Sequence, residues 1–259
     1  MSAFRRGVTC WKCDHWRRGQ YHAAMARPFL TARWQDLVII TWPVPEELLR
    51  ARLPEGLELD RWQGRACVSL VAFDFRDCRV KGIAFPGLVN FPEVNLRFYV
   101  REAASGRRGV VFIREFVPSH VISLVARVVY NEPYRAVRMR SSVEFSGGRV
   151  KVEHALSLRP TPLRITAGAS ADTWVPPDDT AEHFFKEHSW GYGKNRRGRA
   201  LVYEVRHPVW SIRRAVSVSI DGDLGQVYGP EWAFLNTEPP LNVLLAVGSA
   251  VEVFGHAGL

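Results

Sequence analysis

One stretch of the chain places four side chains capable of chemistry on the same side of a predicted β-strand. Residues 91–100 alternate without a break, and successive side chains of a strand point to opposite faces of a sheet. One face is apolar; the other carries the acid, amide, guanidinium and phenol of Glu93, Asn95, Arg97 and Tyr99. Such a face suits the lining of a polar pocket, and the alternative is a solvated face with a cross-strand ion pair.

The next predicted strand, residues 109–117, contains Arg114 and Glu115. It follows a turn at Ser105-Gly106, so the two strands form a predicted hairpin that brings these residues toward Glu93. An arginine fork suits a substrate carboxylate, and a carboxylate beside it can move a proton. A structural Arg–Glu network inside a barrel is the alternative. The first hypothesis assigns acid–base roles to Glu93 and Glu115, and substrate contacts to Asn95, Arg97 and Arg114.

Two further clusters each combine a histidine with a tryptophan. The segment His188-Ser-Trp-Gly-Tyr192 is expected at the C-terminus of a short helix, and His207-Pro-Val-Trp210 at the end of a strand. An imidazole, an indole and a phenol together can stack on a planar ligand and hydrogen-bond to it; alternatively they cap a core. The hypothesis adds His188 and His207 as acid–base residues, and Trp190 and Tyr192 as pocket walls.

Motifs for cofactors and metals are absent from the body of the chain. It has no glycine-rich dinucleotide loop, Walker loop, nucleophile elbow or His-Glu-x-x-His segment, so we predict no cofactor and no metal there. Cys67 and Cys78 lie in strand-like apolar surroundings and are expected to be inert. In the N-terminal stretch, Cys10 and Cys13 with His15 and His22 have a spacing that could bind zinc, although no second cysteine pair follows.

Charge is concentrated at the N-terminus. Residues 1–35 contain seven basic residues and one acidic residue, which leaves 28 basic and 25 acidic residues in the rest of the 259-residue chain. The body is therefore almost balanced, unlike a nucleic-acid-binding surface. No apolar run is long enough to cross a membrane, and no signal peptide is recognisable. We expect a cytoplasmic protein with free thiols, a small-molecule ligand, no nucleic-acid or membrane partner, and a possible homodimer.

Turn signals and apolar periodicity predict a mainly β fold. Residues 1–29 are expected to be a disordered basic extension, and residues 30–259 one domain built as an antiparallel closed β-barrel with two or three peripheral helices. Strands are predicted at residues 37–42, 57–62, 65–80, 91–102, 109–117, 134–145, 150–158, 200–205, 212–220 and 243–254. Helices are predicted at residues 46–53, 119–130 and 180–188.

The order of these segments resembles the domain of unknown function 2071 family. The resemblance is carried by Leu57–Leu70, Glu93–Val100, Gly109–Glu115, the two histidine clusters and Tyr228-Gly-Pro-Glu231, and it covers about residues 30–255. That family looks like part of the acetoacetate decarboxylase-like superfamily. The resemblance implies a closed, double-layered barrel with a central cavity, and often a dimer.

In acetoacetate decarboxylase a catalytic lysine forms a Schiff base with the substrate, and a second cation lowers the pKa of that lysine, a standard example of an activated nucleophile. This chain departs from that pattern. None of the five lysines here forms an adjacent pair, and the stretch where a pair is expected offers Tyr134 and Arg135. Arginine is a poor imine former. The sequence thus favours a lyase-like, hydratase-like or isomerase-like enzyme that moves protons on a small carboxylate- or carbonyl-bearing molecule without a Schiff base. A ligand-binding protein without turnover is the alternative.

Overall fold

Seven strands close into a barrel in the computed structural model, which describes residues 27–121, 133–194 and 200–258. Around the barrel the hydrogen-bonded order is β1, β3, β4, β5, β10, β11 and β13, and β13 pairs with β1 to close the ring, with Val38 opposite Leu245. Their bounds are β1 Leu30–Pro43, β3 Cys67–Val80, β4 Phe91–Glu102, β5 Arg108–Val117, β10 Trp190–Lys194, β11 Ala200–Arg206 and β13 Asn242–Gly258. The predicted closed β-barrel is confirmed.

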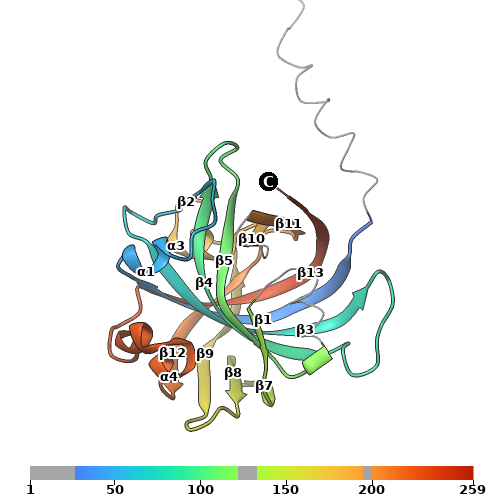
Figure 1. Ribbon diagram of the computed structural model, residues 1–259. Coiled ribbons are helices and arrows are strands. Elements are labelled where there is room, and N and C mark those ends of the chain that lie inside the picture. Colours follow the sequence, from blue (N-terminus) through green and yellow to red (C-terminus); the bar gives the residue numbers. More distant parts are fainter. Residues whose placement is uncertain (1–26, 122–132, 195–199, 259) are drawn as a thin grey trace, which may run out of the picture.

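Four more strands extend the same sheet beyond β13 and cover one side of the barrel. They follow in the order β12 (Ile212–Asp221), β9 (Leu163–Trp174), β8 (Arg149–Leu156) and β7 (Met139–Ser146), and β12 joins β13 where Ile212 lies opposite Ala246. In Figure 1 β7, β8 and β9 lie below β1 and β3. Alternate residues of β8 and β9, such as Val152 and Ile165, are buried against the outer face of the barrel. The result is the double layer that the family resemblance implies.

The described helices are all short. They are α1 (Glu47–Arg50), α3 (Ala181–Lys186), α4 (Leu224–Tyr228) and the 3₁₀ helix η1 (Pro230–Asn236). Thr180 begins α3 by accepting a hydrogen bond from the His183 amide, and Asp223 begins α4 in the same way from Gly225 and Gln226. None of the described helices combines the length and apolarity needed to cross a membrane. The predicted helix at residues 46–53 is shorter than expected, and most of the one at 119–130 lies outside the described residues.

Several sequence-based strand assignments need correction. The two-residue turn at Gln63-Gly64 forms as predicted, but β2 (Leu57–Leu59) pairs with β4 rather than with β3. The predicted strand at residues 134–145 divides into β6 (Tyr134–Ala136), beside β5, and β7. The sequence did not predict β9. It did not predict β10 either, because residues 188–192 were assigned to the C-terminus of a helix. The sheet is mixed, since β5 runs parallel to both β6 and β10.

Two hydrophobic clusters lie on opposite sides of the barrel wall. One packs the outer faces of β1, β3 and β4 against the second layer, with Ile40, Leu70 and Leu96 all at most 1% exposed. The other lies on the opposite faces of the same strands and includes Ile39, Val71 and Phe73. Because strand side chains alternate, the polar face of β4 lies on the side of this second cluster, inside the barrel. The fold therefore places Glu93, Asn95 and Arg97 inside the barrel.

Candidate functional site

A cavity of about 120 Å³ lies inside the barrel, and its lining combines polar and apolar residues. The polar and charged residues of the lining are Glu93, Asn95, Arg97, Glu115, Tyr134, Lys186 and His188. The apolar and aromatic ones are Leu30, Trp34, Leu37, Val71, Phe73, Phe75, Val205, Trp210 and Val253; Val110, Phe112, Trp190, Gly191 and Tyr203 complete the wall. Such a space suits a small molecule with one polar and one apolar part.

Glu93, Asn95 and Arg97 of β4 face this cavity. Glu93 is 3% exposed, Asn95 1% and Arg97 9%, so none of them is a solvated surface residue. The register sets them against the neighbouring strands, with Glu115 of β5 opposite Asn95 and Ser69 of β3 opposite Arg97. The expected polar pocket face is therefore what the strand forms, and the alternative of a solvated face is wrong.

Glu93 has two hydrogen-bond donors and a raised pKa. Asn95 Nδ2 donates to its Oε1 at 3.0 Å, and the Tyr134 hydroxyl donates to its Oε2 at 3.1 Å. Burial raises the pKa of Glu93 to about 7, although these hydrogen bonds and the charge of Arg97 act in the opposite direction. A carboxyl with a pKa near 7 exists in both protonation states at neutral pH, so it can both donate and accept a proton.

Tyr134 stands between the two carboxyl groups of the cavity. β6 pairs with β5 so that Tyr134 lies opposite Glu115, while its hydroxyl reaches Glu93. Burial raises the pKa of Tyr134 well above 10, and the nearby charges of Glu115 and Glu93 raise it further. Tyr134 is therefore a neutral phenol that holds Glu93. It lies in the stretch where the resemblance to the acetoacetate decarboxylase-like superfamily predicts a pair of lysines.

Arg97 and Tyr99 fix the end of helix α3 against the cavity wall. Arg97 Nη2 and the Tyr99 hydroxyl both donate to the Phe185 carbonyl, at 3.2 Å and 3.3 Å. The Tyr99 hydroxyl also shares a hydrogen bond of 2.5 Å with Ser69 Oγ, which in turn contacts Thr41 Oγ1 at 2.6 Å. These contacts pre-organise Arg97 by holding one edge of its guanidinium.

Several buried polar atoms at the cavity have no hydrogen-bond partner among the described residues. They are Asn95 Oδ1, Arg97 Nε, both ring nitrogens of His188 and Trp34 Nε1. Buried polar atoms are nearly always paired, because an unpaired one costs about 1–3 kcal/mol. Donors and acceptors left open around one cavity are the arrangement expected of a site that receives a polar ligand.

His188 is held as a neutral imidazole. Burial lowers the pKa of His188 well below 6.5, and the positive charges of Arg108 and Arg97 lower it further. Its ring lies 4.8 Å from the Tyr99 ring, centroid to centroid. A neutral imidazole here can donate or accept one hydrogen bond, but it is a weak base at neutral pH. Its placement at the cavity agrees with the prediction, and its charge state narrows its role to hydrogen bonding.

Three predicted site residues lie outside the cavity. Arg114 points to the opposite side of β5 and donates to the Val227 carbonyl, because adjacent residues of a strand face opposite ways and Glu115 faces inward. Tyr192 is fully buried in the outer hydrophobic cluster. His207 lies behind Trp210, stacked on its ring at 4.0 Å, and bonds the Pro208 carbonyl through Nδ1. Contrary to the prediction, Arg114, Tyr192 and His207 therefore do not line the cavity.

Trp190 and Gly191 of β10 both line the cavity. The Arg107 guanidinium lies 4.4 Å from the centroid of the Trp190 ring. Gly191 is needed because the Tyr203 ring packs directly on its Cα: an added Cβ would lie 2.0 Å from Tyr203 Cζ. The sequence interpretation assigned Gly191 to a helix end; the structure assigns it to a strand with an aromatic ring against it.

The main residue that sequence reasoning missed is Lys186. Its side chain is 0% exposed, it lines the cavity, and its Nζ lies 2.5 Å from Glu187 Oε1. The residue stands at the last position of a short amphipathic helix, where a lysine normally reaches solvent, so its type and spacing gave no signal. Trp34 and Tyr203 were also missed, since isolated aromatic residues of strands usually belong to a core.

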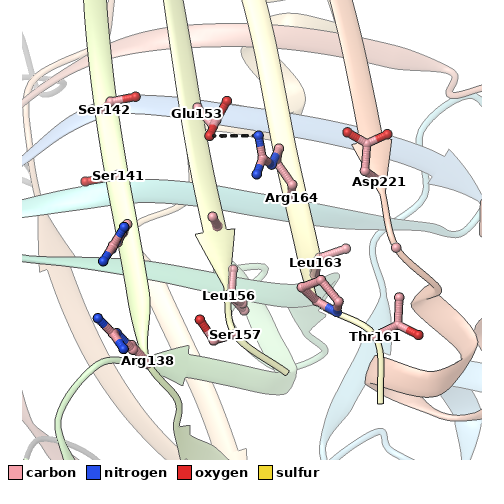
Figure 2. Close-up of a pocket in the computed structure, with 14 residues that line it drawn as sticks. Arg138, Ser141, Ser142, Glu153, Leu156, Ser157, Thr161, Leu163, Arg164 and Asp221 are labelled. Carbon is pink, nitrogen blue, oxygen red and sulfur yellow. Dashed lines mark ion pairs between the residues drawn. The ribbon is translucent and has the colours of Figure 1, made fainter. Parts of the chain in front are cut away.

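A larger, open groove lies elsewhere, on the outer face of the second layer. It has a volume of about 860 Å³ and is bordered by the ends of β7, β8, β9 and β12 (Figure 2). Its charged groups include Arg138, Arg140 and the ion pair between Arg164 and Glu153, 3.5 Å apart and drawn as a dashed line in Figure 2. Arg138 and Arg140 are exposed, so solvent screens their charges. The barrel cavity is the better candidate despite its smaller volume, because its polar lining residues are buried.

Metal and thiol chemistry find little support in the described part of the chain. No three His, Cys, Asp or Glu side chains gather closely enough within it to hold a metal ion. Cys67 and Cys78 are free and buried, and burial raises the pKa of each thiol to about 11. Both are therefore thiols rather than reactive thiolates at neutral pH. The possible zinc ligands Cys10, Cys13, His15 and His22 lie outside the described residues.

Comparisons with known proteins agree with this architecture. The sequence profile of DUF2071, described as an uncharacterized conserved protein, matches residues 31–250. The uncharacterized protein YqjF of Bacillus subtilis (strain 168) is 35% identical over 211 residues, which cover 76% of this chain and 82% of YqjF.

Two solved structures share the fold. An acetoacetate decarboxylase-like enzyme from Sphingomonas wittichii RW1 has a TM-score of 0.63 at 12% identity, covering 89% of this chain and 92% of that one. The enduracididine biosynthesis enzyme MppR, complexed with pyruvate, has a TM-score of 0.63 at 19% identity, covering 92% of this chain and 93% of MppR. At these identities the likeness shows the fold alone.

Proposed function

The chain belongs to the DUF2071 family, and on that premise we propose that it is an enzyme that transfers protons on a small molecule bearing a carboxylate or a carbonyl. One observation carries the proposal: unpaired buried polar atoms of Asn95, Arg97 and His188 converge on a cavity beside Glu93, whose pKa is about 7. Strongly perturbed carboxyl groups beside an open cavity are typical of acid–base sites. Lyase-like, hydratase-like or isomerase-like chemistry fits these groups.

Each polar residue has a role that follows from its contacts. Arg97 donates to the carboxylate of the substrate through Nε, which has no protein partner, while Nη2 stays on the Phe185 carbonyl. Glu93 gives or takes the proton, and Tyr134 and Asn95 orient it. Glu115 supplies a second carboxyl on the other side of Tyr134. His188 contributes a neutral hydrogen bond, and Trp190 borders the site.

The fold relatives support the kind of ligand. MppR was solved with pyruvate, which carries both a carboxylate and a carbonyl within six heavy atoms. The cavity here has about 120 Å³, and an engineered protein cavity of ~150 Å³ binds benzene, a molecule of comparable size. A ligand on the order of six heavy atoms therefore fits.

A binding protein without turnover is the second candidate. It is favoured by the hydrogen bonds that already hold Glu93 and Arg97, since a fixed network binds a ligand without moving a proton. Cytoplasmic location, a homodimer and one domain over residues 30–259 belong to the same proposal. The free thiols of Cys67 and Cys78 support a reducing compartment.

Thermal shift with short keto and hydroxy acids tests the proposal. A ligand at 100 times its Kd stabilises the folded protein by about 2.7 kcal/mol, on the order of 5–10 °C for a chain of this size. We expect acids of this class to raise Tm in the wild-type protein and in an Arg114→Met control, but not in Arg97→Met. Hits are then assayed for turnover, and a hit that is bound but never converted favours the second candidate.

A further inference from the structure

Helix α3 ends inside the barrel with a buried lysine that no catalytic role has used. The Phe185 carbonyl accepts hydrogen bonds from Arg97 and Tyr99, so the end of the helix is held beside Arg97 at the cavity. The next residue, Lys186, lines that cavity with a side chain that is 0% exposed. Lysine is almost never fully buried unless it is paired, so its partners decide its role.

The lysine ammonium is only partly satisfied by the protein. Its one hydrogen-bond acceptor among the described residues is Glu187 Oε1, at 2.5 Å. An ammonium group has three N–H donors, so two of them lack a protein acceptor in a buried position. Donors left unpaired away from water are costly, more so when they carry charge. A ligand oxygen would satisfy them.

Glu187 is itself fixed, which keeps the ammonium in place. Its Oε1 also accepts a hydrogen bond from the Trp210 amide at 3.1 Å, and its Oε2 lies 3.9 Å from His207 Nδ1. Trp210 lines the cavity and donates through Nε1 to Ser249 Oγ at 2.8 Å. The Glu187 carboxylate is therefore held against the cavity wall. It neutralises the charge of Lys186 but accepts only one of the three N–H groups.

We propose that Lys186 is a second ligand-binding residue, which donates hydrogen bonds to an oxygen substituent of the acid whose carboxylate Arg97 holds. The planar guanidinium fork matches a carboxylate, whereas a compact ammonium matches a single oxygen atom. The inference rests on the proposed function and narrows its substrate class to short acids that carry a hydroxyl or carbonyl oxygen, on the order of six heavy atoms. Lys186 acts in this role as a charged donor, and no covalent bond forms.

The test compares butyrate with 2-hydroxybutyrate and 3-hydroxybutyrate, with Kd measured by isothermal titration calorimetry. In the wild-type protein at least one hydroxy acid should bind roughly tenfold tighter than butyrate, the scale of one hydrogen bond to a charged group. Equal affinity for all three acids in the wild-type protein overturns the inference without any variant.

A matched pair of variants isolates the ammonium group. Lys186→Met alone removes the ion-pair partner of Glu187, a half-buried carboxylate, and could unfold the protein, so Glu187→Gln is compared with Lys186→Met/Glu187→Gln. Replacing a buried ion pair by neutral side chains of similar volume is often tolerated. The preference for the hydroxy acid should persist in Glu187→Gln and shrink to within about twofold in the double variant.

The outcomes separate the inference from the proposed function. A preference of unchanged size in the double variant overturns the role of Lys186 while the acid-binding site stands. Failure of every acid to bind the wild-type protein overturns the proposed function and the inference together. Circular dichroism and Tm of each variant verify that a loss of binding is not a loss of fold.

Discussion

The protonation of Glu93 can be measured through the pH dependence of stability. Its pKa in the folded protein is about 7, against an ordinary value of 4.5. The folded protein therefore keeps this proton between those pH values while the unfolded chain has lost it, and stability must fall as pH rises toward and through 7. The total loss in the free energy of unfolding is ~3 kcal/mol, because each unit of pKa difference between the folded and unfolded states contributes about 1.36 kcal/mol. About 2.5 kcal/mol of this loss occurs between pH 5 and pH 8.

The comparison of wild-type protein with Glu93→Gln isolates this contribution. Glutamine keeps the shape of a protonated carboxyl, so it can still accept from Asn95, and it cannot ionise. Urea unfolding at pH 5, 6, 7 and 8 should show the wild-type protein losing about 2.5 kcal/mol relative to the variant across that range. Glu58→Gln is the matched control, because Glu58 has an exposed side chain paired with Arg101 at 3.6 Å. A difference between wild type and Glu93→Gln that stays constant with pH would refute the raised pKa, and with it the acid–base role near neutrality.

Three further predictions concern the cavity. Glu93→Gln should leave folding intact and abolish any turnover; unchanged activity would remove Glu93 from the mechanism. Arg97→Met should weaken the binding of a short carboxylate ~10- to 100-fold by calorimetry while Arg114→Met does not, because Arg114 lies outside the cavity; equal losses would mean that Arg97 acts through the fold. Borohydride trapping with keto acids should add no mass to the protein, because the Lys186 ammonium, ion-paired with Glu187, has no lone pair for attack on a carbonyl; an adduct on any lysine would contradict this.

Much of the barrel could be predicted because alternation along a strand fixes which side chains share a face. Residues 91–102 show it most clearly, and Glu93, Asn95 and Arg97 all lie where this pattern puts them. The same rule does not place Arg114 correctly, because Val110 and Phe112 of β5 also line the cavity and strict alternation from them would point Arg114 inward. A register shift between β4 and β5, where Leu96 pairs with Arg114 and Arg97 with Phe112, reverses the faces, so that Glu115 lines the cavity and Arg114 does not.

Other features could not be predicted from local patterns. β9 follows a proline-rich stretch and carries small residues such as Ala167, Gly168 and Ala169, which are weak strand formers. β10 is only five residues long and pairs in parallel with β5. Parallel strands are not joined by a tight turn, so no turn motif in the sequence indicates this pairing. Lys186 enters the cavity because long-range contacts of Arg97 and Tyr99 hold the end of its helix, 86 to 88 residues away in sequence.

A crystal structure of the protein with 2-hydroxybutyrate tests the central claim most directly. The account predicts the acid inside the barrel, with its carboxylate within ~3 Å of the Arg97 guanidinium and its hydroxyl within hydrogen-bond distance of Lys186. An acid bound only in the open groove between β7 and β12, or a cavity in which ordered water alone satisfies Asn95, Arg97 and His188, would contradict it.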